Sequence, residues 1–461
     1  MITLKLGQIA EVLNAKVFDI SHFSQEVSGV SIDSRTTQPG DIFFALSDVR
    51  DGHDFAQAAA DRGAKAIVVA RRLDIDIPQL FVIDTLKALG DLAKWYRTLF
   101  DIPIIAITGS VGKTTTREMV RHILSTKYKV ASAPGNFNNL IGLPLSMLSM
   151  DYDTEVGVFE LGINQPGEME VLADICQPDI AIVTKIAPVH LEYLGTLENI
   201  ANEKLKLWKT IMARKGRCIY NLDDELLEKY GSECSGSRIT FGVKQDADFY
   251  ASKINLENGY PSFNVDEHSI ELKTLGIHNV YNALAAYACA VLFEIPPSEI
   301  ADSLSSYEPF NGRMKTETIN GITIVDDSYN ASPIAVKSGI STVSLIGDGR
   351  RYAVLGDMLE LGLNETRYHS DILQFALNSG IDGILLVGPI YGRALEELHS
   401  DMELRPSRFF ADNIDIITHF KSRDELKKKL AAMAEPGSLF YFKGSKKMNM
   451  SEFIQALKGG K

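Results

Sequence analysis

The chain has 461 residues, more than one hydrophobic core usually supports, so two or three domains are expected. Hydrophobic residues make up 45% and charged residues 23%, as in ordinary folded domains, and this composition excludes a largely disordered chain. The formal net charge of −13 argues against a nucleic-acid or anionic-membrane partner, because phosphate groups attract a basic face.

The N-terminal segment MITLKLGQIAEVLNAK carries acidic and polar residues where a signal peptide needs an unbroken apolar core, so none is expected. No apolar run of about 18 residues occurs along the chain, so no membrane span is expected either. The 4 cysteines form no CxxC pair, which is typical of proteins in a reducing compartment. Together these features predict a cytoplasmic location.

Three α/β domains are predicted in chain order. Residues 1–84 alternate short strands and helices, as in VSGVSIDSRTTQPGDIFFAL and AAADRGAKAIVV, and form a small domain. An amphipathic helix over 86–100 leads into a second domain over 85–312, where the apolar strands IPIIAIT, VGVFEL and IAIVTKI alternate with helices. This alternation predicts a mostly parallel sheet with ligands at the carboxyl ends of its strands. The strands ITIVDDS, YAVLGDM, GILLVG and SLFYFKG predict a Rossmann-like third domain over 313–461, without a dinucleotide fingerprint.

The stretch TGSVGKTTT, residues 108–116, looks like a phosphate-binding loop that is two residues short. The pattern GxxxxGK[ST] needs a glycine where Ile107 stands. The stretch nevertheless lies between a predicted strand and the predicted helix REMVRHIL, where free backbone N–H groups and the helix dipole attract anions. Lys113 is expected to neutralise phosphate charge and Thr114 to ligate Mg²⁺, and we favour this nucleotide site over a simple turn.

Two further side chains follow apolar strands of the second domain. Glu160 ends the strand VGVFE, where a carboxylate is either a surface residue or a magnesium ligand beside the phosphates; the second interpretation is favoured. His190 lies in the loop APVHLEYLG after the strand IAIVTKI. A lone loop histidine is more often simply solvated, so its interpretation depends on the helix that follows.

That helix, TLENIANEKLKLWKTIM, places Lys204 in the middle of an apolar stripe. Lys206 and Lys209 are predicted to point away from the stripe. A lysine on a buried face either extends to solvent along its stem, or it must pair, lose its proton or be chemically modified. The residues alone leave these alternatives open. The apolar members of the stripe are Leu197, Ile200, Leu207, Trp208 and Ile211.

The segment LGIHNVYNALAAYACAV predicts a long helix that begins near His278. Asn279 and Asn282 lie at its start, and asparagines in such positions usually cap the helix. Their amides can also bind a purine edge, so both interpretations stay open.

The third domain adds polar residues at strand ends. Arg313 stands at the predicted hinge, and the strand ITIVDDS ends in Asp326 and Asp327. These acids either cap the next segment or hold a ribose hydroxyl or a cationic group across an interdomain cleft. Lys443 and Ser445 follow the last strong strand, again at a carboxyl edge.

Taken together, these stretches resemble the Mur ligase family almost end to end. The shared motifs are SIDSRTTQPGDIFFAL and DGHDF in the first domain, TGSVGKTTT, GNFNNLIGLPL, ELGINQPGEM, HLEYLG and IHNVYNAL in the second, and GRMKT, DDSYNASP, LGDMLELG and FKGSKKMNM in the third. So many motifs in one order make a chance match very improbable. The stretch DDSYNASP separates the chain from the sister enzymes that add a diamino acid, which carry a DNPR type of stretch.

The resemblance implies ATP-dependent amide formation in which D-alanyl-D-alanine is added to UDP-N-acetylmuramoyl-tripeptide. ATP phosphorylates a substrate carboxylate, the incoming amine attacks the acyl phosphate, and phosphate leaves. It also implies two Mg²⁺ ions and a carbamylated Lys204, because the matching lysine of the family commonly carries that group. A monomer is expected.

The resemblance assigns roles residue by residue. Lys113, Glu160, His190 and Lys204 are the expected catalytic residues, and Thr114, Glu160, His190 and Lys204 the expected metal ligands. The expected ATP contacts are Gly109, Ser110, Val111, Gly112, Lys113, Thr114, Thr115, Asn279, Arg313 and Asp327. The UDP end is assigned to Ser31, Ser34, Arg35, Asp51, Gly52 and His53. The amine substrate is assigned to Tyr329, Asn330, Lys443 and Ser445.

Two positions depart from the family pattern. Lys185 stands at a strand end where asparagine is usual, and Val189 replaces a common alanine before the histidine. A lysine beside the metal cluster either weakens ion binding or contacts a phosphate oxygen. Two alternatives therefore accompany the main hypothesis: a related amide ligase with another amine acceptor, and a nucleotide-binding homologue with impaired catalysis. The residues do not distinguish diaminopimelate from lysine in the tripeptide.

Overall fold

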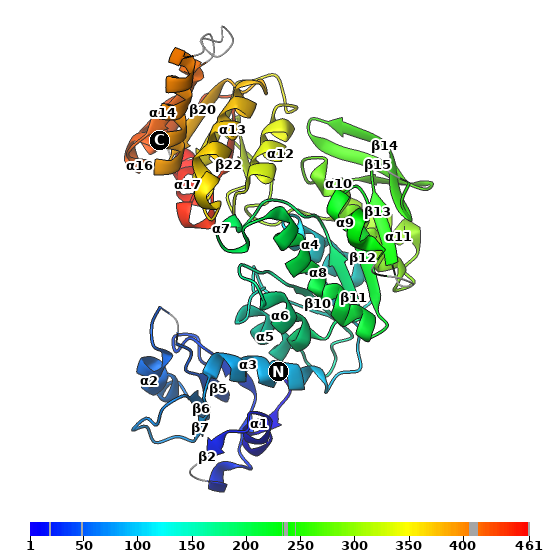
Figure 1. Cartoon of the computed structure of the whole chain (residues 1–461), viewed down its shortest axis with the longest axis vertical. Coiled ribbons are helices and arrows are strands. Elements are labelled where there is room, and N and C mark those ends of the chain that lie inside the picture. The colour runs from blue at the N-terminus through cyan, green and yellow to red at the C-terminus, as the bar shows by residue number, and fades with distance from the viewer. Residues whose placement is uncertain are drawn as a thin grey trace.

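In the computed structural model the chain forms three successive α/β domains, coloured blue, green and yellow to red in Figure 1. The structure describes residues 1–17, 20–47, 49–232, 234, 238–244, 246–404 and 414–459. The predicted three-domain α/β fold is confirmed, while the boundaries at residues 84 and 312 stay predictions. Across the described ranges, no helix is both long enough and apolar enough to cross a membrane.

The N-terminal domain contains a five-stranded sheet of order β2-β7-β6-β5-β4. Strands β4 to β7 run parallel, and β2 pairs antiparallel with β7. Every residue of β5 and β6 is buried, as expected for parallel strands covered on both faces. The elements are β1 (Leu4–Lys5), α1 (Leu6–Val12), β2 (Lys16–Val17), η1 (Ile20–His22), β3 (Glu26–Val27), β4 (Gly29–Ser31), β5 (Asp41–Phe44), η2 (Gly52–Phe55), α2 (Ala56–Asp61), β6 (Ala66–Val69) and β7 (Gln79–Phe81).

Helix α3 (Thr85–Arg97) packs against both the N-terminal and the central domain. The Asp84 side chain caps its first turn. Its apolar face belongs to one hydrophobic cluster that includes residues of both domains. The Tyr96 hydroxyl lies in that cluster, donating to the Met150 carbonyl and accepting from the Ile2 amide, both at 2.7 Å. The two domains therefore share a core.

The central domain is built on a nine-stranded sheet of order β16-β15-β14-β13-β12-β11-β8-β10-β9. Strands β8 to β13 run parallel, as predicted. Its elements are β8 (Ile104–Thr108), α4 (Lys113–Leu124), β9 (Val130–Ser132), α5 (Gly142–Leu148), β10 (Val156–Glu160), α6 (Glu168–Cys176), β11 (Ile180–Val183), α7 (Leu191–Leu194), α8 (Leu197–Ala213), β12 (Arg217–Asn221), α9 (Glu225–Gly231), β13 (Arg238–Gly242), β14 (Phe249–Glu257), β15 (Tyr260–Val265), β16 (His268–Glu271), α10 (His278–Val291) and α11 (Pro297–Ser306).

Three neighbouring strands of this sheet bring the motif loops together. Strand β8 lies between β10 and β11, with Glu160 opposite Ile107 and Val183 opposite Thr108. Because all three strands are parallel, their carboxyl ends meet at one edge. The antiparallel meander β14 to β16 at the far edge was not predicted. It extends the sheet away from the motif loops.

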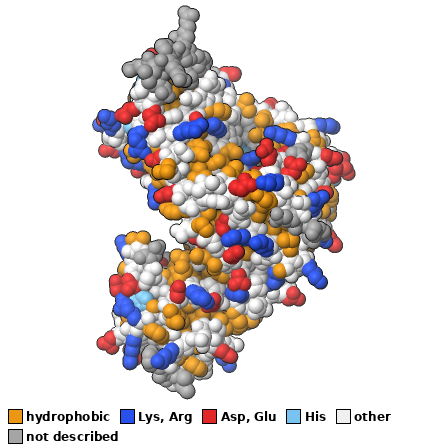
Figure 2. Space-filling view, in the orientation of Figure 1, with side chains coloured by type: hydrophobic (Ala, Val, Ile, Leu, Met, Phe, Trp, Pro, Cys, Tyr) orange, Lys and Arg blue, Asp and Glu red, His pale blue; other side chains and the backbone are white. Residues whose placement is uncertain are grey.

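The C-terminal domain has a six-stranded sheet of order β17-β18-β22-β19-β20-β21, parallel except for β17. Its elements are β17 (Lys315–Ile319), β18 (Ile322–Asp326), α12 (Pro333–Val343), β19 (Arg351–Gly356), η3 (Gly362–Asn364), α13 (Glu365–Leu377), β20 (Gly383–Val387), α14 (Pro389–Leu404), η4 (Ile414–Ile416), β21 (Ile417–Phe420), α16 (Arg423–Met433), β22 (Leu439–Lys443), η5 (Lys446–Met448) and α17 (Ser451–Gly459). Helices α7 and α12 lie where this domain faces the central one (Figure 1). Figure 2 shows the surface hollowed between the N-terminal domain and the rest of the molecule.

Candidate active site

The short phosphate loop depends on two glycines. Strand β8 is buried throughout, and α4 begins directly after Gly112, which has a φ of 86°. Gly109 has a φ of 146°, and a Cβ there would lie 2.0 Å from the Thr184 hydroxyl. A Cβ on Gly112 would lie 2.4 Å from the Asn282 amide oxygen. Both positions therefore require glycine, and the loop turns with only two residues between them.

Lys113 folds back over this loop. Its ammonium donates to the Gly109 carbonyl at 2.9 Å and to the Ser110 carbonyl at 3.4 Å. Desolvation lowers its pKa, while Glu160 opposes that shift. An anion bound at the start of α4 would favour the charged amine and offer it a stronger partner than the carbonyls.

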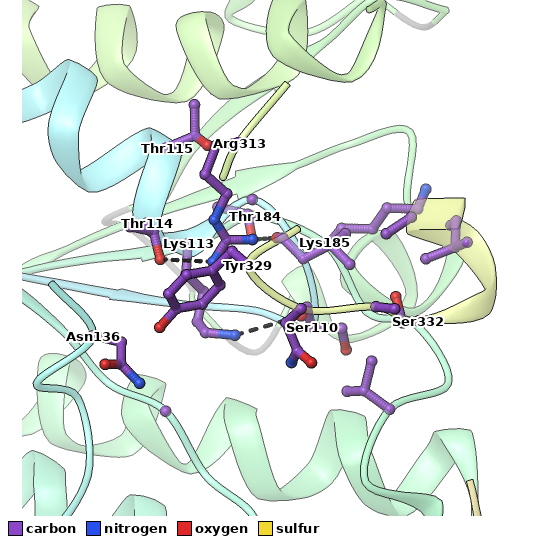
Figure 3. A pocket seen from close by; sticks show the side chains of 18 of the residues that line it. Ser110, Lys113, Thr114, Thr115, Asn136, Thr184, Lys185, Arg313, Tyr329 and Ser332 are labelled. Atoms are coloured by element: carbon purple, nitrogen blue, oxygen red, sulfur yellow. Dashed lines mark hydrogen bonds between the residues drawn. The ribbon is translucent and has the colours of Figure 1, made fainter. Parts of the chain in front are cut away.

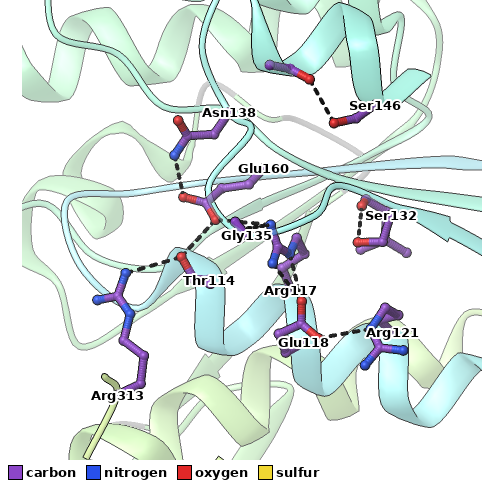
Figure 4. Close-up of polar contacts among 12 residues, drawn as sticks. Thr114, Arg117, Glu118, Arg121, Ser132, Gly135, Asn138, Ser146, Glu160 and Arg313 are labelled. Atoms are coloured by element: carbon purple, nitrogen blue, oxygen red, sulfur yellow. Dashed lines mark hydrogen bonds and ion pairs between the residues drawn. The ribbon is translucent and has the colours of Figure 1, made fainter. Parts of the chain in front are cut away.

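Glu160 is the centre of a buried polar cluster (Figure 4). One carboxylate oxygen accepts from the Thr114 hydroxyl at 2.8 Å, and the other accepts from the Asn138 amide at 2.7 Å. The Arg117 guanidinium, itself fully buried, lies 3.7 Å from the Thr114-bonded oxygen. Arg313 of the C-terminal segment donates to the Thr114 hydroxyl at 3.3 Å. These bonds fix Glu160 at the carboxyl edge of the sheet.

Lys204 is buried in α8, with 1% of its surface exposed. Burial, and then the charge of Lys113, lowers its pKa well below the usual value; Glu160 and Glu203 oppose this. A side chain so enclosed does not reach solvent along its stem, so the snorkelling alternative is wrong. The predicted apolar stripe holds except at Leu197, which is 38% exposed because it begins the helix beyond the core.

His190 pairs with a residue that sequence reasoning did not single out. Its Nδ1 lies 2.6 Å from a carboxylate oxygen of Glu360, in the C-terminal domain. This hydrogen bond lowers the pKa of Glu360. His190 has a φ of 52° and immediately precedes α7. Glu360 belongs to the motif LGDMLELG, whose sequence gives no indication of the partner.

A cavity of about 710 Å³ lies between the central and C-terminal domains. Figure 3 shows Arg313 and Tyr329 beside the loop residues Lys113 and Thr114; the guanidinium carbon is 4.1 Å from the centre of the tyrosine ring. Lys185 also lines the cavity. The predicted site residues that line it are Ser110, Val111, Gly112, Lys113, Thr114, Thr115, Glu160, His190, Asn279, Arg313, Asp327, Tyr329, Asn330, Lys443 and Ser445.

On the C-terminal wall of the cavity, Asp327 accepts hydrogen bonds from two buried side chains of the last strand. One of its carboxylate oxygens accepts from the buried Lys443 ammonium and from the Tyr441 hydroxyl. Ser445 accepts the Leu359 amide at 2.8 Å, so its hydroxyl braces the neighbouring loop. The cap interpretation of Asp327 is therefore replaced by a charge pair with Lys443.

Asn279 and Asn282 do not cap α10, because the capping position is Ile277 and no side chain bonds to the first turn. The Asn279 amide group donates to the Thr274 hydroxyl at 3.0 Å and to the Leu275 carbonyl at 2.7 Å. Its oxygen accepts from Asn282 at 2.8 Å. The two asparagines instead fix the loop before α10 at the cavity wall.

The residues assigned to the UDP end lie elsewhere, at the carboxyl edge of the N-terminal sheet. Ser31 and Ser34 are buried, whereas the Arg35 side chain is 84% exposed and pairs with Asp33. None of the six lines the cavity described above. The structure thus separates this group from the phosphate loop.

Asp51 and His53 bond to each other, and the partly exposed Asp51 carboxylate also pairs with Arg71 at 2.9 Å. His53 Nδ1 lies 2.6 Å from Asp51, and its Nε2 accepts the Ala70 amide at 2.9 Å. Gly52 fits closely here, since a Cβ would lie 2.4 Å from the Leu46 carbonyl oxygen. The motif DGHDF therefore shapes this loop through internal bonds.

Replacing His53 by alanine is expected to lower the free energy of unfolding by about 2–4 kcal/mol, because it opens a cavity and leaves the Ala70 amide unpaired. The matched control is Arg35→Ala, which removes an exposed ion pair and should change it by about 0.5 kcal/mol or less. Urea unfolding followed by fluorescence measures both. Equal midpoints for the two variants would contradict the structural role of His53.

Acid is expected to destabilise the loop that carries Glu360. The fully buried His369 donates Nδ1–H to the Glu365 carbonyl at 2.7 Å and accepts the Met358 amide on Nε2 at 2.9 Å. Burial lowers its pKa from 6.5 to about 4. Between these values the unfolded chain binds a proton that the folded chain does not. The stability that neutral His369 contributes is therefore fully present above pH 6.5. As the pH falls towards 4, the free energy of unfolding decreases by on the order of 3 kcal/mol.

Urea unfolding at several pH values tests this linkage, with His369→Gln as the matched variant. Glutamine keeps one donor and one acceptor but does not titrate. The native protein should lose stability more steeply than the variant as the pH falls below 6.5. Equal slopes for the two proteins would show that His369 does not carry the effect.

The family described as the Mur ligase middle domain matches residues 107–290, the Mur ligase glutamate ligase domain matches 312–446, and the Mur ligase family catalytic domain matches 26–97. The chain belongs to the Mur ligase family.

Within that family the chain is homologous over its full length to the MurF ligases. A UDP-N-acetylmuramoyl-tripeptide–D-alanyl-D-alanine ligase of Bacillus subtilis is 33% identical over 466 residues, covering 99% of each protein. The crystal structure of MurF from Acinetobacter baumannii matches with a TM-score of 0.89 at 28% identity, covering 99% of both chains. A MurF ligase of Thermotoga maritima, solved in complex with ADP, matches with a TM-score of 0.80 at 26% identity, covering 94% of this chain and 97% of that one.

Proposed function

We propose that this chain is an ATP-dependent ligase that joins D-alanyl-D-alanine to UDP-N-acetylmuramoyl-tripeptide in peptidoglycan precursor synthesis. The observation that carries the proposal is a cavity that is lined by the phosphate loop of the central domain and also by Arg313 and Lys443. A ligase that joins two substrates through ATP needs such a chamber between domains. The full-length similarity to ligases of this printed activity supports the assignment.

ATP is proposed to lie along the cavity from the phosphate loop to α10. Lys113 and the free amides at the start of α4 hold the phosphates. Both amide hydrogens of Asn279 are used within the protein, and its oxygen already accepts one hydrogen bond from Asn282, so its second lone pair is proposed to accept the adenine amino group. Asp327 binds Lys443 and Tyr441 through one oxygen and offers the other to the ribose. The Thermotoga maritima MurF ligase was solved in complex with ADP, which supports nucleotide binding by this chain.

The donor set fits Mg²⁺. The Thr114 hydroxyl and the near carboxylate oxygen of Glu160 are 2.8 Å apart, close to the roughly 2.9 Å that separates adjacent ligands of an octahedral Mg²⁺ ion. The described residues contain no cluster of three or more His, Cys, Asp or Glu that could hold a metal. That is compatible with ions that take most ligands from phosphates and water. When bound, Mg²⁺ would screen the repulsion between ATP and the substrate carboxylate.

The reaction is proposed in two transfers. The tripeptide carboxylate attacks the terminal phosphorus of ATP, and ADP leaves with the bond electrons. The uncharged amine of D-alanyl-D-alanine then attacks the acyl carbon, loses a proton, and expels inorganic phosphate from a tetrahedral intermediate. Lys113 and Arg313 stabilise the negative charge on the phosphoryl oxygens during both transfers. With the substrates bound, the cavity between the two domains is proposed to keep water away from the acyl phosphate.

Lys204 is proposed to be carbamylated. Its lowered pKa favours the uncharged amine, which is the form that attacks CO₂, loses a proton and becomes an anionic carbamate. The product places a negative charge near Lys113, whose positive charge disfavours a protonated Lys204 but favours an anion there. It would also supply oxygen ligands for a second ion together with Glu160 and His190. The burial of Lys204 supports this modification.

The two remaining substrate groups are proposed to bind on different domains, the UDP end on the N-terminal domain and the dipeptide on the C-terminal domain. Arg35, the most exposed of the first-domain candidates, is proposed to bind the pyrophosphate of UDP. Tyr329, Asn330 and Ser445 lie on the C-terminal wall, where the dipeptide would enter. Because nucleotide-linked substrates of this kind are proposed, a cytoplasmic location is proposed as well. The protein is still predicted to be a monomer.

An amine screen tests the acceptor. Purified protein is incubated with ATP, Mg²⁺ and UDP-N-acetylmuramoyl-tripeptide, and the product mass is measured with D-alanyl-D-alanine, D-alanine, L-lysine or diaminopimelate as the amine. Of these four amines, only D-alanyl-D-alanine is expected to give product. Faster product formation with another amine would favour the related-ligase alternative.

A further inference from the structure

A carboxylate from the C-terminal domain contacts the histidine of the central domain. Glu360 and His190 are joined at 2.6 Å through Nδ1, although they lie 170 positions apart in the sequence. The Glu192 amide also donates to the Glu360 carbonyl at 3.4 Å. A backbone and a side-chain contact therefore link the two domains at the cavity that both residues line.

Both partners are held in a backbone conformation that non-glycine residues rarely adopt. His190 has a φ of 52° and Glu360 a φ of 65°. Such conformations persist where the surroundings fix them, often at functional sites. The loop before Glu360 is fixed by two bonds, from the Leu359 amide to the Ser445 hydroxyl at 2.8 Å and from the Met358 amide to His369 at 2.9 Å. The position of Glu360 is therefore built into the C-terminal domain.

We propose that Glu360 is a positioning residue that orients His190 when the C-terminal domain docks on the central domain. By accepting the Nδ1 proton, Glu360 fixes the ring and selects the tautomer whose Nε2 carries a lone pair. Within the described part of the chain Nε2 has no hydrogen-bond partner, so it is available to the cavity. His190 reaches this state only with the two domains together, which couples docking to chemistry. The inference rests on the ligase function proposed above.

The kinetic test compares Glu360→Ala with a matched control. The control is Glu365→Gln, which removes another carboxylate of the same domain, paired with the surface residue Arg393. Glu360→Ala is expected to lower kcat by about 10- to 100-fold with little change in the KM for ATP. Glu360→Gln, which can still accept the proton, should keep more activity, and the control should match the native protein. An unchanged kcat in Glu360→Ala would overturn the proposal.

A double-mutant cycle separates positioning from a general structural role. If Glu360 acts through His190, adding Glu360→Ala to His190→Ala should cost less than about two-fold further in kcat. If Glu360→Ala lowered kcat as much in the His190→Ala background as it does in the native protein, the proposal would be overturned.

A spectroscopic readout is independent of turnover. In protein carrying ¹⁵N-labelled histidine, the His190 signal is identified by its absence in His190→Ala. It should report a protonated Nδ1 and an unprotonated Nε2, and this state should be lost in Glu360→Ala. The opposite tautomer in the native protein would overturn the inference. If the tautomer is as expected but the protein forms no ligation product, the proposed ligase function is refuted, while the orientation of His190 by Glu360 is still supported.

Discussion

Replacing Lys113 by alanine should lower kcat/KM for ATP by roughly 10³-fold or more, because the variant loses the cation nearest the transferring phosphoryl group. The ammonium contacts backbone carbonyls of its own loop, so the phosphates are its natural partners when ATP is bound. Phosphate release under saturating tripeptide nucleotide and dipeptide measures the effect. Lys113→Arg is expected to recover little, since a planar guanidinium does not reproduce the compact ammonium that contacts the loop carbonyls.

The matched control for this variant is Lys127→Ala. Lys127 lies just after the C-terminal end of α4, the helix that Lys113 begins. Lys127 pairs with Glu299 at the surface, 3.0 Å away, and its loss should leave activity unchanged. The unfolding midpoint of Lys113→Ala should stay near that of the native protein. Activity of Lys113→Ala within tenfold of the native protein would contradict the phosphate role of the loop.

Replacing Lys204 by alanine should remove most activity, by about 10²- to 10³-fold, because the carbamate that balances Lys113 can no longer form. Small anions such as bicarbonate or acetate should restore part of it by occupying the vacated space. The same anions should not rescue Lys113→Ala, which lacks a cation. Phosphate release with and without added anion measures the rescue.

Lys209→Ala is the matched control, since Lys209 is an exposed lysine on the same helix. It should be fully active and insensitive to added anion. A direct measurement accompanies the kinetics: ¹³C NMR in labelled bicarbonate should show a carbamate in the native protein that is missing in Lys204→Ala. Unchanged turnover in Lys204→Ala would refute the carbamate role.

The parts of the site that sequence predicted are those with local signals. The loop TGSVGKTTT is bounded by an apolar strand and an amphipathic helix, so its position at a helix start follows from the pattern alone. Lys204 was predicted on a buried face because helical periodicity places it between Ile200 and Leu207. The parallel order around β8 follows from strand and helix alternation.

The parts that were missed depend on pairing between distant segments. Arg117 and Asn138 support Glu160 from two other elements, and no sequence spacing relates them. Glu360 meets His190 through the docking of two domains. In the N-terminal domain, nothing in the sequence indicated that the Asp51 side chain also bonds to His53 in its own loop, while the assignment of Asp51 to the UDP end stays a prediction. Side-chain partners of this kind are decided by tertiary packing.

The most direct test of the central claim is phosphate release from ATP as each substrate is omitted in turn. The proposed ligase should release one phosphate for each product formed when UDP-N-acetylmuramoyl-tripeptide and D-alanyl-D-alanine are both present. Release should fall to background when either is left out, because the acyl phosphate needs the tripeptide carboxylate and its turnover needs the dipeptide amine. Equal release of phosphate without the dipeptide would contradict the account.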